Sequence, residues 1–359
     1  MAEPVEPVRV KIRGRELTTW ETVEISRGIF RGCGQFGLRY AEADRRQVPF
    51  FPGDAVEIWW GRSQRMLVGY VDNLDHVLES DDHSITLSGR DSSADLVDCS
   101  VDPQGPQEFT KIDLADLANL LTAPFDVPVN VEGDSGEVFD QFTLEPSESV
   151  WSAIERGARI KGLLVYSPGD GTLLITTPGR RRAGQPLREG VNVLSAHLRL
   201  RHGERFSDYH VLDAQPGSDD LFGAAAASVI RSSEDAGVFR HRPLVIPAED
   251  SMTPAGATSR AQWEATVRAA RATRLEVVVA GWDKFRSGKE PGQLWRVNEL
   301  VRVDIPTLEI ATDMLVEEIS YSRSFAPHGG TRATLALVRK DAYVPAPVIE
   351  IEAAEEGER

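Results

Sequence analysis

The chain offers few residue groupings that could carry out acid–base or covalent chemistry. Glu148 and Glu155 lie seven positions apart on a predicted helix and are the most obvious carboxylate pair. A glycosidase needs one carboxyl group in an apolar pocket and a second across a cleft, whereas this spacing favours two solvated side chains on one helical face. The seven histidines contain no pair at the spacing of a zinc protease. We therefore predict no catalytic residue, no metal ligand, no cofactor and no enzymatic activity.

Three further groups could be mistaken for functional sites. Ser92 and Ser93 follow a predicted strand, but a catalytic elbow needs glycine on both sides of its serine, so we expect Asp91 or Ser92 to cap a short helix. Cys33 and Cys99 fit no metal spacing and are predicted to be buried free thiols. Arg180–Arg182 could contact a phosphate or an acidic partner. The alternative, a solvated loop tip, is favoured because three arginines are too few to reverse a net charge of −16.

The composition limits the classes of partner. The 359 residues include 41% hydrophobic and 27% charged residues, which is typical of globular domains with sizeable cores. A net charge of −16 argues against phosphate neutralisation, so we expect no specific nucleic-acid binding. No apolar run reaches the ~18 residues of a membrane span, and Met1–Arg15 lacks the apolar region of a signal peptide. We therefore expect no membrane insertion.

The clearest structural signal is a period of two between apolar and polar residues. It predicts a three-stranded antiparallel meander within residues 54–91 and a second within residues 300–341. The middle strand opens with Met66-Leu67-Val68 in the first meander and with Met314-Leu315-Val316 in the second. This similarity favours an internal duplication, although short alternating strands can also match by chance.

The order of these patterns predicts a mainly β (α+β) protein with two similar antiparallel β-barrel-like domains. We assign residues 1–100 to the first barrel-like domain and 101–185 to a small helix-plus-hairpin domain, with helices expected to begin at Thr110 and Ser147. Residues 186–345 form the second barrel-like domain. It is predicted to carry an insertion at 216–274 that contains a helix at 259–272, capped by Ser259. The acidic residues 346–359 form a tail.

Several short motifs together resemble the baseplate hub proteins of contractile-tailed phages of the Mu type. The resemblance covers residues 8 to 345 and is carried by Gly89–Asp91 with Asp95–Ser100, Arg242–Leu244, Arg260–Glu264, Gly281–Trp282 leading into Gly292–Asn298, and Asp341–Tyr343. Each motif is weak alone, and none is a ligand set. Their order and spacing carry the resemblance.

The resemblance implies a structural protein of the virion, assembled in the host cytoplasm. It implies a homotrimer that adapts a sixfold tail tube to a threefold central spike, contacts other baseplate proteins and lets DNA pass. Two similar domains repeated in three chains would supply six similar units. Two alternatives stay open. Tryptophans such as Trp59, Trp60, Trp282 and Trp295 could stack on sugars in a carbohydrate-binding or adhesin component, and a tail-associated cell-wall hydrolase is the less favoured possibility.

Overall fold

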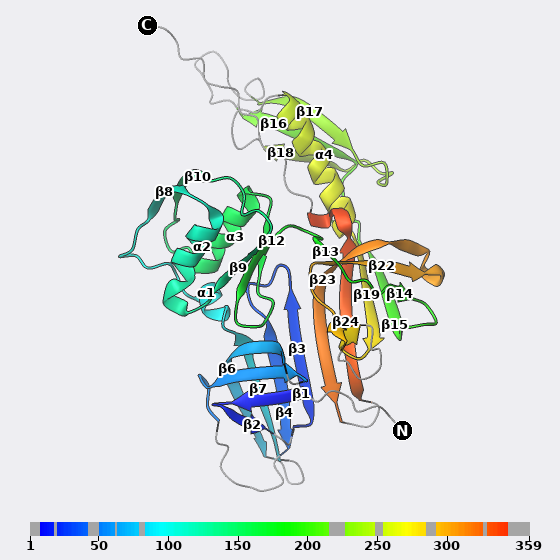
Figure 1. Ribbon diagram of the computed structural model, residues 1–359. Helices are drawn as coiled ribbons and strands as arrows, with labels where there is room; N and C mark the ends of the chain where they lie inside the picture. The colour runs from blue at the N-terminus through cyan, green and yellow to red at the C-terminus, as the bar shows by residue number, and fades with distance from the viewer. Residues whose placement is uncertain are drawn as a thin grey trace. The chain divides into compact units, whose positions relative to one another are not determined.

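The computed structural model describes residues 8–17, 20–41, 50–61, 63–78, 83–214, 227–247, 254–284, 292–325 and 329–343. The chain divides into two compact units. Unit 1 comprises Met1–His197 and Glu276–Leu337, and unit 2 comprises Leu198–Leu275 and Val338–Arg359. Strands predominate, as predicted (Figure 1). The acidic tail predicted at 346–359 lies outside the described residues.

The first lobe of the sheet is formed by the N-terminal strands. These are β1 (Val8–Ile12), β2 (Arg15–Leu17), β3 (Thr22–Gly28), β4 (Gln35–Ala41), β5 (Ala55–Trp60), β6 (Gln64–Leu78) and β7 (His83–Asp91). Their spatial order is β3-β4-β7-β6-β5-β1. Strands β5, β6 and β7 pair antiparallel in succession, which confirms the first predicted meander. Alternate residues such as Val56, Ile58 and Trp60 are buried, because one face of the sheet covers the core.

The second lobe is formed by strands from the C-terminal half of the chain. These are β13 (Arg181–Arg182), β14 (Leu187–Arg188), β15 (Ser195–Leu200), β19 (Thr273–Ala280), β22 (Glu299–Ile305), β23 (Ile310–Ser324) and β24 (Gly330–Arg339). Their order is β15-β19-β24-β23-β22, with β13 and β14 on the outer side of β22. Strands β22, β23 and β24 form the second predicted meander. A short hairpin of β20 (Asp283–Lys284) and β21 (Gln293–Leu294) precedes it.

The two lobes share one strand order. The order β3-β4-β7-β6-β5-β1 in the first lobe corresponds strand by strand to the order β15-β19-β24-β23-β22-β14 in the second. The last pairs differ, since β1 runs antiparallel to β5 whereas β14 runs parallel to β22. The Met-Leu-Val triplets both lie in the middle strand, but they begin at the third residue of β6 and the fifth residue of β23. The topology therefore carries the repeat, while the matching triplets are displaced by two residues.

Strand β23 joins the lobes. Its first part, Ile310–Leu315, pairs with β22, and its second part, Glu318–Ser324, pairs antiparallel with β3. This pairing makes one 14-stranded sheet. In the described residues the sheet does not close on itself, so the predicted barrel-like lobes are open. Trp60 of the first lobe packs on Trp282 with ring centroids 4.9 Å apart, and both rings are buried.

A helix-and-strand domain lies between the lobes in the sequence. It contains α1 (Ala94–Asp98), β8 (Glu108–Ile112), α2 (Leu114–Thr122), the 3₁₀ turn η1 (Ala123–Phe125), β9 (Val129–Glu132), β10 (Phe139–Thr143), α3 (Val150–Ile160), β11 (Leu164–Tyr166) and β12 (Leu173–Thr176). The predicted hairpin β11–β12 is confirmed, and β9 extends it by pairing parallel with β12. Leu114, Leu117, Ile154 and Ile175 are among the residues of its own core.

The predicted starts of both helices in this domain are wrong. Thr110 lies in β8, and Asp113 caps α2 by accepting a hydrogen bond from the Asp116 amide. Ser149, not Ser147, caps α3 and accepts a hydrogen bond from the Ser152 amide. Each predicted cap precedes the true one by two or three residues, because serine, threonine and aspartate are all competent caps and the sequence offers several in each segment.

Unit 2 differs from the insertion predicted at 216–274. The unit already begins at Leu198, and it includes β16 (Asp208–Ala214). Strands β17 (Ala227–Glu234) and β18 (Pro243–Pro247) flank β16 in a three-stranded sheet, where no regular structure was expected. Helix α4 runs from Pro254 to Arg271, so the predicted helix at 259–272 begins too late. The core of this sheet and helix contains Tyr209, Val211, Ala257 and Ala261.

Two 3₁₀ turns complete the described elements. They are η3 (Pro306–Leu308), which connects β22 to β23, and η4 (Lys340–Tyr343), which packs against α4 within unit 2. Over the described part of the chain, no helix is long and apolar enough to cross a membrane.

The second lobe contains a buried ion pair that allows a stability test. Lys284 Nζ donates to both carboxylate oxygens of Glu299 at 2.7 and 2.6 Å, and Lys284 is 1% exposed. Burial lowers the pKa of the Lys284 ammonium, against the opposing effect of Glu299. Removing one partner leaves the other buried without its counter-charge. We expect Lys284→Met to destabilise the protein by about 3–5 kcal/mol, measured by chemical unfolding.

The double variant Lys284→Met/Glu299→Leu should recover much of that loss, because neither charge then stays buried. The exposed pair Arg9–Glu16 is the control, and its removal should change stability little. Equal losses in the single and double variants would show that packing, not charge, dominates at this position.

Candidate functional site

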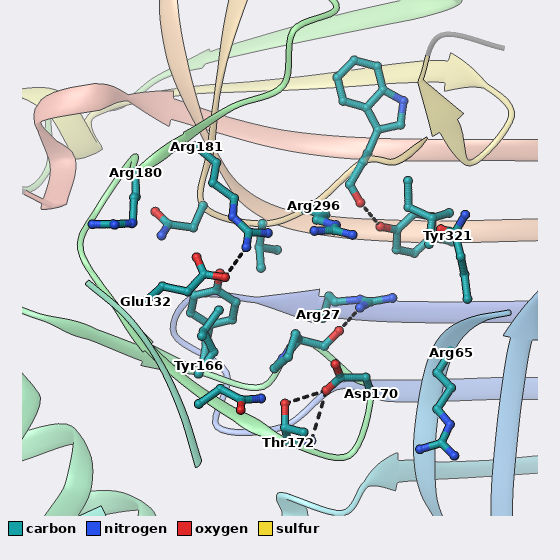
Figure 2. Close-up of a pocket in the computed structure, with 18 of the residues that line it drawn as sticks. Arg27, Arg65, Glu132, Tyr166, Asp170, Thr172, Arg180, Arg181, Arg296 and Tyr321 are labelled. Carbon is teal, nitrogen blue, oxygen red and sulfur yellow. Dashed lines mark hydrogen bonds and ion pairs between the residues drawn. The ribbon is translucent and has the colours of Figure 1, made fainter. Parts of the chain in front are cut away.

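Unit 1 contains a polar pocket of about 690 Å³ (Figure 2). Its lining comes from both lobes of the sheet and from the helix-and-strand domain. The described residues around it include five arginines, Arg27, Arg65, Arg180, Arg181 and Arg296, and two carboxylates, Glu132 and Asp170. The pocket is therefore locally basic in a chain whose net charge is −16.

The arginines are brought together from distant parts of the sequence. Arg27 lies on β3, Arg65 on β6 and Arg181 on β13. Arg180 precedes β13, and Arg296 lies between β21 and β22. Figure 2 shows these side chains arranged around one hollow. In the sequence only Arg180 and Arg181 belong to a local basic cluster, whereas the other three arginines are isolated.

Arg27 is the buried member of this group, with 9% of its surface exposed. It donates to the carbonyl oxygen of Pro168, and its guanidinium lies 5.2 Å from the centre of the Tyr321 ring. Pro168 belongs to the loop between β11 and β12, whereas Tyr321 lies on β23. Arg27 therefore connects the helix-and-strand domain to the strand that joins the two lobes.

The carboxylates of the pocket already have partners. Glu132 forms an ion pair with Arg181. Asp170 accepts hydrogen bonds from the amide and hydroxyl of Thr172, the latter at 2.7 Å. Neither is held in the apolar environment that would suit a general acid. The more numerous guanidinium groups are suited to binding carboxylate or phosphate oxygens, so the chemistry available here is anion binding.

The structure corrects the prediction for Arg180–Arg182. The three side chains are exposed, but Arg181 and Arg182 form β13 and pair with β22 instead of forming a loop tip. Arg182 forms an ion pair with Asp313 at 2.8 Å. Two of the three charges are therefore neutralised locally, which the sequence could not show because both acidic partners are remote.

The other candidate residues have structural environments. Glu148 receives two hydrogen bonds from Arg156, at 3.0 and 2.8 Å, so it does not form a pair with Glu155. Cys33 is buried, but Cys99 is exposed, so the prediction of two buried thiols is wrong for Cys99. Burial raises the pKa of the Cys33 thiol to about 11.

The tryptophans proposed as sugar platforms are mostly inaccessible. Trp60, Trp282 and Trp295 are each at most 2% exposed. Trp59 is partly exposed, but Lys11 and Arg65 lie 5.9 and 5.0 Å from its ring centre. Stacking on a sugar needs an accessible ring face, so these residues do not favour the carbohydrate-binding alternative.

Asp91 is fully buried and holds three parts of unit 1 together. The prediction that Asp91 or Ser92 caps the short helix is wrong, because Ser93 is the N-cap of α1 and makes no side-chain cap hydrogen bond. The Asp91 carboxylate accepts hydrogen bonds from the amides of Gly34 and Ser93 and from the hydroxyl of Ser167, the last at 2.6 Å. These donors belong to the β3–β4 turn, the start of α1 and the loop after β11. Burial raises the pKa of Asp91 to about 6, although each of these hydrogen bonds acts to lower it.

The loop after β11 approaches the first lobe closely beside Asp91. The Val68 amide donates to the carbonyl oxygen of Gly169 at 2.9 Å. Gly169 has a φ of 92°, and a Cβ at this position would lie 2.6 Å from the carbonyl oxygen of Met66. Glycine is required here by both its backbone conformation and the close contact.

The raised pKa of Asp91 predicts a pH dependence of stability. The folded carboxyl group keeps its proton up to pH ~6, whereas an unfolded aspartate releases it near pH ~3.9. The free energy of unfolding should therefore fall between these values, by at most about 1.4 kcal/mol per pH unit, and become constant above them with respect to this group. Subtracting the Asp91→Asn curve from the wild-type curve isolates this contribution. Ser167→Ala should extend the fall to higher pH, and a flat difference curve would contradict the assignment.

The contact at Gly169 predicts a large cost for a small substitution. Gly169→Ala should destabilise unit 1 by more than the ~1–2 kcal/mol of a strained left-handed backbone, because its new methyl group meets Met66. Gly53→Ala is a matched control, since Gly53 has a φ of 93° and no atom within 4 Å of the added Cβ. Thermal unfolding of both variants measures the difference. Equal losses would mean that the loop moves away without cost.

Three families of phage baseplate domains match consecutive parts of the sequence. Residues 7–91 match the family described as Mu phage baseplate assembly protein GpP-like, N-terminal. Residues 93–177 match baseplate hub protein gp44-like, second domain, and residues 253–346 match Mu phage baseplate assembly protein GpP, fourth domain. The boundaries at residues 91–93 and 177 fall close to the ends of β7 and β12.

Individual relatives agree with these matches. Baseplate hub protein gp44 of Escherichia phage Mu is 30% identical over 338 residues, which cover 92% of this chain and 87% of that protein. The 43 kDa tail protein of prophage MuSo2 from Shewanella oneidensis is 30% identical, with a TM-score of 0.83 over 96% of this chain and all of the other. A tail protein from Neisseria meningitidis MC58 has the same fold, with a TM-score of 0.75 at 22% identity over 94% of this chain and 98% of that one.

The motifs quoted from the sequence, the order of the sheet and a relative that matches nearly the whole chain all lead to one conclusion: this protein belongs to the family of Mu-type phage baseplate hub proteins.

Proposed function

We propose that three copies of this protein form a ring that adapts a sixfold tail tube to a threefold central spike and leaves an opening for DNA. The observation that carries this proposal is the shared strand order of the two lobes. Three chains with two similar lobes each present six similar units, while the whole chain repeats only three times. Such a ring has approximate sixfold symmetry where the lobes alone make contact and threefold symmetry elsewhere.

The proposed role is structural and non-enzymatic. Its partners are two further copies of the chain, the central spike, the tail tube and other baseplate proteins. The relatives are named as a baseplate hub protein and as tail proteins, which supports a place in the virion. Assembly in the host cytoplasm, before the particle is released, is part of the same proposal.

The charge of the chain fits a passage that does not hold DNA. Each chain carries a formal charge of −16, and an acidic or neutral wall repels phosphates where a basic wall would bind them. The same charge opposes association of the three chains. The interfaces must therefore bury apolar surface or form hydrogen bonds that outweigh this repulsion.

The decisive measurement is the mass of the purified protein by light scattering, alone and with its spike. We expect the mass of three chains, and a ring with a central opening in electron micrographs. A chain that stays monomeric with its spike would overturn the proposal. In a gel shift with duplex DNA, we expect no retention at ~0.15 M salt, where the Debye length is about 8 Å. Tight binding there would contradict the non-binding passage and leave the trimer standing.

A further inference from the structure

The long middle strands of the two lobes differ in what covers their second halves. In β23, the first part pairs with β22 and the part Glu318–Ser324 pairs with β3. In β6, the first part pairs with β5 up to Tyr70. Among the described strands, none pairs with Asp72–Leu78 on the side where β5 ends. Both middle strands contain 15 residues. Among the described strands, the corresponding half of β6 therefore presents an open edge.

The exposure of the two segments reflects this difference. Ile319 and Tyr321 of β23 are at most 1% exposed, and no residue of Glu318–Ser324 is fully exposed. In β6, Asn73 and the run Asp75–Val77 are exposed, and Val77 retains 42% of its surface. An exposed sheet edge ready to pair is normally blocked or covered in a native protein.

The strand that corresponds to β3 is also at an edge. Strand β3 is the outermost strand of the first lobe and pairs with the middle strand of the second. Its counterpart in the shared strand order is β15, the outermost strand of the second lobe and the last strand of the sheet. Ser195, His197, Arg199 and Leu200 of β15 are exposed, and Leu200 retains 67% of its surface.

Among the described strands, no pairing joins β15 to β6. Each edge contains one histidine, His76 or His197, but the β6 segment also carries the carboxylates Asp72 and Asp75 whereas β15 carries Arg199 and no acidic residue, so their charges are complementary. Asp72 is already paired with Arg90 at 2.7 Å, which leaves Asp75 as the acidic side chain most available to a neighbour.

We propose that β15 of one copy pairs antiparallel with Asp72–Leu78 of β6 in the next copy, and so repeats between chains the β3–β23 pairing seen within the chain. This inference rests on the proposed ring and identifies the surface that closes it. Each chain then offers one edge of each kind, so the contact is head-to-tail and closes only when the last β15 meets the first β6. Backbone hydrogen bonds provide this contact despite the like net charge of the chains.

Cysteine cross-linking tests the pairing directly. In a Cys33→Ala/Cys99→Ser background, one preparation carries His197→Cys and a second carries Asp75→Cys, His76→Cys or Val77→Cys in turn. We expect that mixing the two preparations under mild oxidation gives a two-chain band on a non-reducing gel for at least one of these positions, and that neither preparation does so alone. A chain carrying both cysteines should give bands up to three chains and no larger.

The joint within the chain provides the matched control. Glu24 and Ser322 are opposite each other in the β3–β23 pairing, so Glu24→Cys/Ser322→Cys should cross-link within one chain and keep the monomer mass. Arg199→Glu should weaken the trimer, and added Asp75→Arg should restore it.

The outcomes separate the two proposals. A trimer by light scattering in which no cross-link joins β15 to β6 would overturn the edge pairing and leave the proposed ring intact. A chain that remains monomeric with its spike would overturn both.

Discussion

The pairing of β3 with β23 is the contact on which the rest of unit 1 depends. Seven residues of each strand, Thr22–Gly28 and Glu318–Ser324, are aligned over almost 300 positions of sequence separation. Through this pairing the two lobes form one continuous sheet (Figure 1). Side chains of both strands, such as Ile25 and Tyr321, are buried. Without this pairing, each lobe would expose an edge and an apolar strip of its face.

The remaining contacts in unit 1 are arranged around this joint. Arg27 is on β3 itself, and it holds the Pro168 carbonyl oxygen on one side and the Tyr321 ring on the other. The same loop reaches the first lobe through Ser167 and Gly169, at Asp91 and Val68. The arginine-lined pocket therefore forms where three parts of the chain meet, beside the paired strands β3 and β23. Its positive charge comes from the five arginines that these parts bring together.

Because the two lobes share one strand order, the β3–β23 contact joins an edge strand of one lobe to the middle strand of a similar lobe. A chain that repeats one strand order twice can use the same kind of contact within itself and between copies. In the proposed ring, contacts within and between chains would therefore be similar in geometry.

The sequence alone predicted most strands of the two lobes and the resemblance to the hub family, but it did not predict β17 and β18. Alternation of apolar and polar residues is a local property, so both meanders and the β11–β12 hairpin could be predicted from nearby residues. The duplication was predicted from the Met-Leu-Val triplets, yet these are displaced by two residues, and only the strand order establishes the correspondence of the lobes. Helix starts failed where several competent caps follow one another, as at Thr110 and Asp113.

Only the tertiary structure decided which strands are neighbours and which charged groups meet. Nothing near Arg27 or Arg296 in the sequence indicates a shared pocket, because their proximity depends on pairings between distant strands. The boundary of unit 2 was missed for the same reason. Strand β16 looks like a strand of the second lobe until its pairing with β17 and β18 assigns it to another sheet. Local patterns specify that a strand forms, but the partner of each edge is selected by packing of the whole chain.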